Sequence, residues 1–153
     1  MGYVEDLRKL VGKRPLILVG SVVVIVNEQG DILLQQRTFP KEVWGLPGGL
    51  MELGETTEEA AEREVFEETR LRINQLKLIN IYSGKEYYTV AENGDEFYSV
   101  TTAYYTATYE GELIANQEEA YDCRFISADN LPDKMIRSHK RIIEDYLKNH
   151  VVK

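Results

Sequence analysis

Residues 44–73 have the sequence WGLPGGLMELGETTEEAAEREVFEETRLRI, and this stretch decides how the chain is expected to fold. Its first part is rich in glycine and predicts a loop, whereas residues 56–69 predict a strong helix. Thr56 and Glu59 have the spacing of a capping box, in which each side chain bonds to the backbone amide of the other residue. The helix is therefore expected to begin firmly at Thr56.

Three carboxylates of this helix are expected to share one face. Successive residues turn by about 100° around a helix axis, so Glu67 lies about 60° to one side of Glu64 and Glu68 about 40° to the other. Like charges repel, and the pair Glu64 and Glu68 would destabilise an isolated helix by roughly 0.2–0.5 kcal/mol. A bound divalent cation would attract all three carboxylates and so outweigh their mutual repulsion. Oxygen ligands such as these suit Mg²⁺ or Mn²⁺. A solvated acidic face has the same spacing, so the helix alone leaves both interpretations open.

The loop before the helix favours the metal site. Gly45-Leu46-Pro47-Gly48-Gly49 brings bare backbone close to the carboxylates, because glycine permits unusual dihedrals and close approach by a ligand. The backbone carbonyl of Gly48 could then complete a magnesium shell. We therefore predict a metal centre where this loop meets the helix.

Residues 49–71 resemble the signature of the Nudix hydrolases, a superfamily that includes the MutT-like proteins. That signature runs Gly, five residues, Glu, seven residues, Arg-Glu, an aliphatic residue, any residue, Glu-Glu, any residue, Gly and an aliphatic residue. The chain supplies Gly49, Glu55, Arg63, Glu64, Val65, Glu67, Glu68 and Leu71 at these positions. The resemblance implies an α/β fold, namely a Nudix-type α/β/α sandwich with a mixed β-sheet, in a single domain over residues 1–153.

One position departs from the family pattern, because Arg70 stands where the signature has its second glycine. This residue ends the helix, and glycine would suit a left-handed cap there. Arginine in that conformation costs about 1 kcal/mol, and the alternative is ordinary helical geometry. No metal ligand is lost, so we expect activity to survive.

The resemblance also implies an activity, which is Mg²⁺-dependent hydrolysis of a phosphoanhydride bond, with Mn²⁺ as an alternative ion. The substrate would be a nucleoside diphosphate linked to another moiety, a class that includes nucleotides, nucleotide sugars and dinucleotides. The metal would be held by Glu64, Glu67, Glu68 and the Gly48 carbonyl. It would neutralise the diphosphate and lower the pKa of a bound water.

The general base stays open among three carboxylates. Glu68 itself is one candidate. Glu119 is another, because it lies in the loop 116–122, where many relatives place a distal glutamate. Its neighbour Glu118 is a third candidate, and simple solvation of the loop explains Glu118 and Glu119 equally well.

Four further residues are assigned roles near the chemistry. Glu55 is expected to orient Arg63 or an outer-shell water. Arg63 has the spacing for an ion pair with Glu67, four residues on, and could equally pair with Glu55 across the loop. Arg37 ends a predicted strand and is either a bidentate donor to the substrate phosphates or a surface residue. Trp44 either stacks on a base or covers the loop, and packing is favoured.

Hydrophobic periodicity and turn residues predict the remaining elements. They are helices over 4–11 and 134–149 and strands over 19–27, 32–37, 76–85, 96–109 and 124–127. Asn93-Gly94 predicts a hairpin before the long strand. His139 and His150, on or beside the last helix, are expected to face solvent.

Composition narrows the partners of this 153-residue chain. Its net charge is −8, whereas a protein that binds nucleic acid through phosphate contacts is usually basic, so a small nucleotide is a better substrate than long nucleic acid. The single cysteine, Cys123, excludes an intrachain disulfide and is expected to be a small apolar strand residue. The longest apolar run, 16–26, is too short for a bilayer, and no signal peptide is expected. These features predict a cytoplasmic protein that binds no membrane, and either a monomer or a homodimer.

Competing functions share the same scaffold. A non-catalytic nucleotide-binding module is the main alternative, but such modules usually lose the metal-binding glutamates that this chain keeps. Isomerisation of a prenyl diphosphate and decapping of RNA 5′ ends are further possibilities on the same fold. The leaving group would be recognised by segments outside the signature, and we expect residues 85–95 and 116–122 to carry that specificity.

Overall fold

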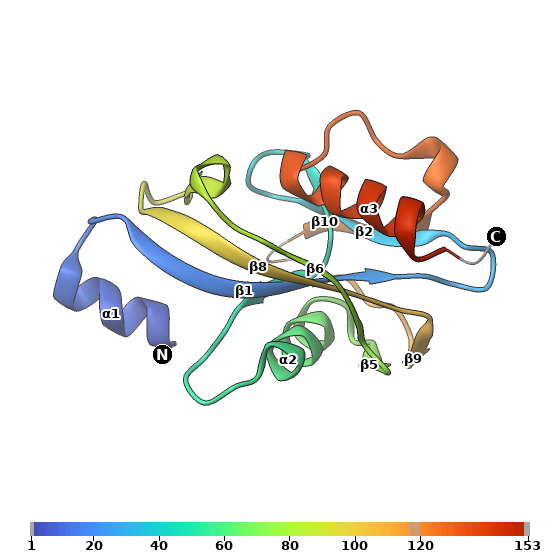
Figure 1. Cartoon of the computed structure of the whole chain (residues 1–153), viewed down its shortest axis with the longest axis horizontal. Helices are drawn as coiled ribbons and strands as arrows, with labels where there is room; N and C mark the ends of the chain where they lie inside the picture. The colour runs from blue at the N-terminus through green and yellow to red at the C-terminus, as the bar shows by residue number, and fades with distance from the viewer. Residues whose placement is uncertain (1, 117, 119, 152–153) are drawn as a thin grey trace.

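The protein is built in three layers, with helix α2 on one side of the β-sheets and helix α3 on the other (Figure 1). The computed structural model describes residues 2–116, 118 and 120–151. Its helices are α1 (Tyr3–Val11), α2 (Thr57–Thr69) and α3 (Arg137–Asn149), with short 3₁₀ turns η1 (Lys85–Tyr87) and η2 (Ala128–Asn130). Its strands are β1 (Leu16–Ile25), β2 (Ile32–Arg37), β3 (Trp44–Gly45), β4 (Gly48–Leu50), β5 (Arg72–Asn74), β6 (Lys77–Tyr82), β7 (Tyr88–Val90), β8 (Glu96–Thr106), β9 (Thr108–Glu110) and β10 (Ala120–Ile126).

The strands form a mixed arrangement, which confirms the predicted fold class. The largest sheet has the order β4-β1-β8-β6, with β7 also paired to β8. Strands β1 and β8 run parallel, while β4, β6 and β7 pair antiparallel to their neighbours. A second sheet has the order β10-β2-β3, and β5 pairs with β9.

The second half of strand β1 is buried on both faces, because each face packs against a different helix layer. Val22 and Val24 join the apolar cluster beneath α3, whereas Val23 and Ile25 join the cluster beneath α2. Side chains alternate across a strand, so a β-branched run such as this one fills both cores at once. The apolar run from Val22 to Ile25 follows from this position.

The predicted loop over 38–54 contains two short strands, β3 and β4. Strand β4 pairs with β1, and the amide of Val23 donates to the carbonyl of Pro47 at 3.0 Å. This pairing was not predicted, because two or three residues carry too little pattern to identify a strand. It draws the glycine-rich loop onto the central sheet.

Several predicted boundaries also move. The strand predicted over 96–109 is interrupted after Thr106, whose hydroxyl bonds to the carbonyl of Asn74, and β9 then pairs with β5. The last strand begins earlier than predicted, at Ala120, and the last helix begins later, at Arg137. The Asn93-Gly94 hairpin is confirmed between β7 and β8, where the Ala91 amide donates to the Asp95 carbonyl. No helix in the described part of the chain is long and apolar enough to cross a membrane.

Candidate active site

Helix α2 begins and ends through local contacts. The Glu59 amide donates to the Thr56 hydroxyl at 3.0 Å and the Thr56 amide to the Glu59 carboxylate at 2.9 Å, which confirms the capping box. At the other end, Arg70 takes the left-handed conformation of the family's glycine, with φ 66° and ψ 8°. Its guanidinium lies 5.2 Å from the ring centroid of Phe66. A cation–π contact of about 0.5–1 kcal/mol offsets much of the strain of about 1 kcal/mol.

Glu68 is the most buried of the three predicted ligands, with 5% of its surface exposed. The Gln35 side-chain amide donates to its Oε2 at 2.7 Å, and the Gly48 backbone amide donates to its Oε1 at 2.8 Å. Burial raises the pKa of Glu68 to about 7, although both hydrogen bonds oppose that shift. The carboxylate is therefore held in a fixed orientation at an energetic cost to its charged form.

Arg63 links the neighbouring carboxylates into one network. It donates to both oxygens of Glu55, at 2.6 and 2.9 Å, and to Oε1 of Glu64 at 2.8 Å. A further bond reaches the carbonyl of Leu50 at 3.0 Å. Its hydrogen bonds hold the pKa of Glu55 below the usual range and raise that of Arg63 itself. Glu67 lies farther away, at 3.5 Å, so Glu55 is the closer of the two predicted partners.

The two glycines before the helix are required by close approach. A Cβ on Gly49 would lie 2.3 Å from Cδ of Glu64, and a Cβ on Gly48 would lie 2.1 Å from the carbonyl oxygen of Ser21. Gly48 pairs with Val22 in the β1–β4 ladder. In an antiparallel ladder, hydrogen-bonded residue pairs alternate with pairs that are not hydrogen-bonded. The neighbouring pair Val23–Pro47 is hydrogen-bonded, so the pair Val22–Gly48 is not, and the N–H and C=O of Gly48 point away from β1. The N–H reaches Glu68 on this side.

Glu67 is more than half exposed and lines a cavity of about 350 Å³. The cavity is also lined by Arg70, Ile114, Ala115, Asn116 and Glu118. The Asn116 amide donates to the backbone carbonyl of Glu68 at 3.0 Å, which fixes this loop to the end of α2. The predicted base candidate Glu118 therefore shares a cavity with a predicted metal ligand. The other candidate, Glu119, lies outside the described residues.

The two residues predicted to contact substrate lie on β2 and β3, and the positive charge of Arg37 opposes the rise in the pKa of Glu68. Arg37, at the end of β2, is half-buried, and its Nη2 lies 3.5 Å from the carbonyl of Leu46. Trp44 packs against the apolar cluster beneath α3, and the guanidinium of Arg124 lies 6.0 Å from its ring centroid. The sequence had left stacking on a base and packing open for Trp44, and the structure places it in packing contacts.

Two residues of the site were not predicted. Gln35 is buried in β2 and orients Glu68. The sequence feature that could have identified it is a polar residue directly after the apolar run Ile32–Leu34. His139 was expected to face solvent, which is wrong, because 8% of it is exposed and its Nδ1 accepts from the Leu46 amide at 3.0 Å. The buried loop needs an acceptor for that amide, and α3 supplies it. His150 is half-buried, 4.9 Å from the ring of Tyr105.

The buried imidazole of His139 predicts an acid-sensitive fold. Burial lowers its pKa to about 3, whereas the unfolded chain binds a proton near pH 6.5. The group's contribution to stability is therefore complete above about pH 6.5 and is lost as the pH falls toward 3. Between pH 7 and pH 5 we expect this residue to remove about 2 kcal/mol from the free energy of unfolding, measured by urea denaturation. His139→Gln, which can still accept from Leu46, should lack this component, and His150→Gln should retain it. An unchanged acid dependence in His139→Gln would contradict the assignment.

The carboxylates of α2 are engaged by protein donors in this structure. Glu64 accepts from Arg63, and Glu68 accepts from Gln35 and Gly48. Within residues 2–116, 118 and 120–151, no three His, Cys, Asp or Glu side chains are arranged to enclose a metal ion. Binding of a cation would therefore exchange some of these hydrogen bonds for metal contacts.

The fold is an α/β/α sandwich, and its capped helix α2 carries a network of carboxylates and Arg63 against the backbone of Gly48 and Gly49. This combination is typical of a Nudix-type hydrolase. The family model of the NUDIX domain matches residues 17–146. An ADP-ribose pyrophosphatase of Methanocaldococcus jannaschii is 31% identical over 126 residues, which is 82% of this chain and 70% of that protein. A putative 8-oxo-dGTP diphosphatase of Bacillus subtilis is 32% identical over 129 residues, which is 83% of this chain and 78% of that protein.

A solved structure agrees with these sequence relatives. The MutT NUDIX hydrolase of Burkholderia pseudomallei superposes with a TM-score of 0.72 at 26% identity, over 84% of this chain and 97% of that one. The chain belongs to the NUDIX family, and the predicted family resemblance and enzyme class are confirmed.

Proposed function

We propose that the protein hydrolyses a phosphoanhydride bond in a small nucleoside diphosphate derivative, in the cytoplasm and with Mg²⁺ as its metal. The observation that carries the proposal is the packing of Glu64 and Glu68 against the bare backbone of Gly48 and Gly49. Two relatives named as a pyrophosphatase and a putative diphosphatase of nucleotide compounds support the substrate class.

The residues present fit a hard divalent cation. Glu64, Glu67, Glu68 and the Gly48 carbonyl offer oxygen donors, which Mg²⁺ and Mn²⁺ prefer. The missing side chain of Gly49 lets the Glu64 carboxylate lie directly against the loop backbone. The net charge of −8 also requires a local positive charge before a diphosphate can approach. When bound, Mg²⁺ supplies this charge and lowers the pKa of a coordinated water.

The protein's own residues orient the reacting groups. Gln35 and the Gly48 amide fix Glu68, while Glu55 holds Arg63, and Arg63 in turn holds Glu64. Such restraint matters because a misplacement of about 1 Å can cost roughly 100-fold in rate.

Arg37 supports substrate binding as a cation beside the loop, where its guanidinium would contact a phosphate oxygen of the substrate. The proton of the attacking water passes to Glu68 or to a carboxylate of the loop that carries Glu118 and Glu119.

The nucleoside is proposed to bind in a cavity of about 830 Å³ between α3 and the η1–β7 segment. Tyr87 and Tyr88 line it from the segment 85–95, which the sequence predicted to carry specificity. Ile136 lines the same cavity, and its amide donates to the carbonyl of Trp44 at 2.9 Å, next to the glycine-rich loop. The volume lies in the range of about 300–1,000 Å³ that is typical of small-molecule sites.

A substrate panel tests the proposal. ADP-ribose, an oxidised nucleoside triphosphate, a nucleotide sugar and a dinucleoside polyphosphate would each be incubated with Mg²⁺, with Mn²⁺ and with EDTA. We expect a nucleoside monophosphate from at least one compound, with no release in EDTA. If nucleotides bind but none is cleaved with either metal, the protein is a binding module and the proposal is wrong.

A further inference from the structure

Helix α2 covers only part of the sheet face on which it lies. Its 13 residues span about 20 Å, whereas the 11 residues of β8 span roughly 36 Å. The Ser21 hydroxyl donates to the carbonyl of Thr57 at 2.8 Å and so marks where α2 begins to cover β1. Toward the start of β1 and β8 the sheet extends beyond α2, and α1 lies beside that end of it (Figure 1).

Large apolar side chains occupy this uncovered region. Ile17, Tyr98 and Tyr88 are directly paired across β1, β8 and β7, and the two tyrosine ring centroids are 5.5 Å apart. The irregularity between Leu78 and Asn80 in β6 places both Leu78 and Ile81 on the face that carries Thr102 and Tyr104 of β8. We define the apolar sheet face as Ile17, Leu78, Ile81, Tyr88, Val90 and Tyr98, which are each between 38% and 74% exposed.

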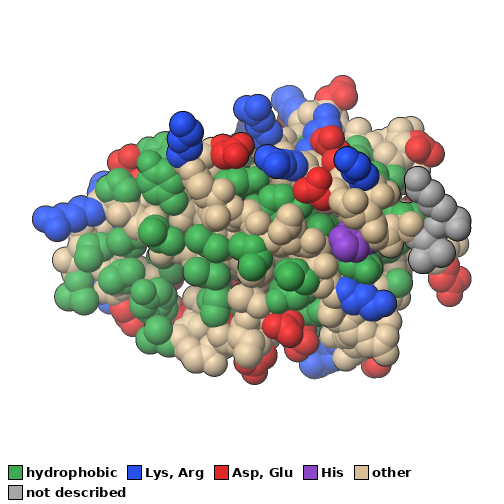
Figure 2. Space-filling view, viewed as in Figure 1, with side chains coloured by type: hydrophobic (Ala, Val, Ile, Leu, Met, Phe, Trp, Pro, Cys, Tyr) green, Lys and Arg blue, Asp and Glu red, His purple; other side chains and the backbone are tan. Residues whose placement is uncertain are grey.

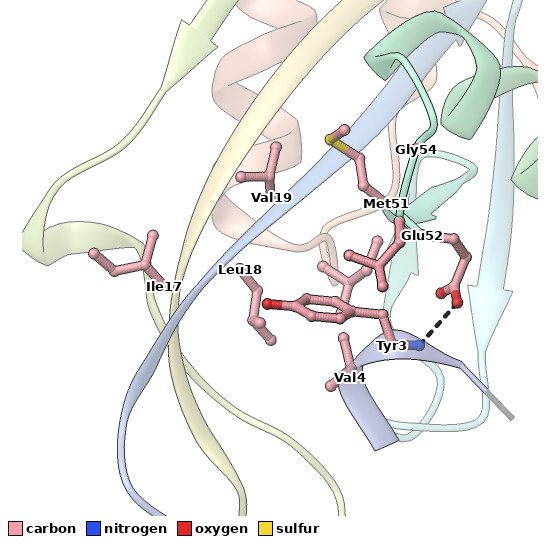
Figure 3. A pocket seen from close by; sticks show the side chains of 10 residues that line it. Tyr3, Val4, Ile17, Leu18, Val19, Met51, Glu52 and Gly54 are labelled. Atoms are coloured by element: carbon pink, nitrogen blue, oxygen red, sulfur yellow. Dashed lines mark hydrogen bonds between the residues drawn. The ribbon is translucent and has the colours of Figure 1, made fainter. Parts of the chain in front are cut away.

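The space-filling view supports this description. Hydrophobic side chains gather over β1, β6 and β8, and charged side chains lie mainly along the upper and lower borders (Figure 2). The apolar surface continues around β1 into a cavity of about 260 Å³ (Figure 3). Val19 and Met51 point to one side of β1 there, and Leu18 points to the other, toward Tyr3 of α1. Helix α1 precedes the matched family span, so part of this cavity is built by residues outside residues 17–146.

The exposed area matches what a dimer needs. If each side chain has a full surface of about 150–250 Å², the exposed fractions of the six residues give an exposed apolar area on the order of 600 Å². A stable interface buries about 800 Å² per partner, and about 65% of a homodimer interface is apolar, so roughly 500 Å² of apolar surface is required. The largest apolar patch of a typical monomer is about 300–600 Å², so the apolar sheet face lies at the upper end of that range.

Charge selects a second copy as the occupant. The chain has a net charge of −8, and the charged residue that pairs with the face across the β7–β8 ladder is the carboxylate Glu96, opposite Val90, which disfavours an anionic lipid surface or a phosphate backbone there. The neighbouring carboxylate Glu96 accepts a hydrogen bond from the Tyr88 hydroxyl. Two copies repel each other through their net charge, and a mainly apolar face is where they approach at least cost.

We propose that two copies of the chain associate through the apolar sheet face, with the row Ile17–Tyr98–Tyr88 near a two-fold axis. A two-fold interface uses the same patch on both copies, and one apolar row can pack against its own symmetry mate. Tyr88 also lines the cavity proposed for the nucleoside, whereas Ile17 and Tyr98 do not, so substitutions at Ile17 and Tyr98 test the association apart from the proposed chemistry.

Sedimentation velocity across micromolar concentrations of the full chain tests this inference. We expect the wild type to sediment as a dimer, and Ile17→Lys and Tyr98→Lys to raise the dissociation constant at least tenfold. Leu10→Lys is the matched control, because Leu10 is 85% exposed on α1 but lies outside the face, and this variant should dimerise as the wild type does. Each substitution lowers the magnitude of the net charge, so loss of the dimer cannot come from a larger net charge, and Leu10→Lys controls for this change in charge. Unchanged thermal unfolding shows that the variants fold.

Three results would overturn the inference. The first is a wild type that stays monomeric at every concentration, and the second is a dimer that persists unchanged in both Ile17→Lys and Tyr98→Lys. The third is a monomeric wild type that sediments with phosphatidylglycerol vesicles, which would assign the face to a membrane surface instead.

Discussion

Glu68→Gln is expected to lower kcat by several orders of magnitude while the protein remains folded. Glutamine has nearly the same volume, but it lacks the charge that a divalent cation and a proton transfer both need. Its amide group would also face two donors, the Gln35 side chain and the Gly48 amide, which the carboxylate now satisfies. Steady-state hydrolysis with saturating Mg²⁺ measures the effect. Full activity in this variant would show that Glu68 is not part of the reaction centre.

The same substitution is expected to stabilise the metal-free protein at alkaline pH. The folded chain keeps a proton on Glu68 up to about pH 7, whereas the unfolded chain loses it near pH 4.3. This group's stabilising contribution is therefore present below about pH 4.3 and is lost as the pH rises through 7. At pH 8 the relief of the buried charge is worth about 4 kcal/mol, and a donor left unpaired by the glutamine amide costs about 1–3 kcal/mol. In EDTA, Glu68→Gln should therefore raise the free energy of unfolding by on the order of 1–2 kcal/mol. Glu67→Gln is the matched control, because that exposed carboxylate should give no such gain.

Gly49→Ala is expected to reduce kcat/KM about 100-fold, because the new methyl group displaces a carboxylate. Its Cβ would lie 2.3 Å from Cδ of Glu64, and ordinary contact begins near 3.4 Å, so Glu64 must move by about 1 Å. That movement also disturbs the bond from Arg63. The half-saturating concentration of Mg²⁺ should rise together with the loss of rate.

Gly54→Ala separates this effect from general backbone strain. Gly54 has φ +83°, so alanine there is strained, but its Cβ would meet no atom within 4 Å. This control should lose about 1 kcal/mol of stability and keep its activity. Wild-type kcat/KM and Mg²⁺ dependence in Gly49→Ala would contradict the role assigned to Glu64.

Features set by neighbouring residues were predictable from the sequence. The capping box at Thr56 and the shared face of the three glutamates follow from helix spacing alone. Strand β2 was predicted with its bounds. Its apolar residues Ile32, Leu33 and Leu34 directly follow the turn residues 28–31, which marks where the strand begins. Cys123 is a buried strand residue, as its type suggested.

Features set by residues far apart in the sequence were not predictable. Gln35 and Glu68 are 33 positions apart, and His139 and Leu46 are 93 positions apart, so neither hydrogen bond has a local signal. The helix wheel treats Glu67 and Glu68 alike, yet β2 packs over Glu68 and leaves Glu67 open to the cavity beside Glu118. Arg70 had two open conformations, and its contact with Phe66 accompanies the left-handed one.

Anomalous diffraction from crystals grown with Mn²⁺ tests the central claim most directly, because it locates the ion without reference to activity. We expect an anomalous peak within about 2.0–2.6 Å of carboxylate oxygens of Glu64, Glu67 and Glu68 and of the Gly48 carbonyl. An enzyme that hydrolyses its substrate with Mn²⁺ but binds the ion elsewhere, with these carboxylates still held by Arg63 and Gln35, would contradict it.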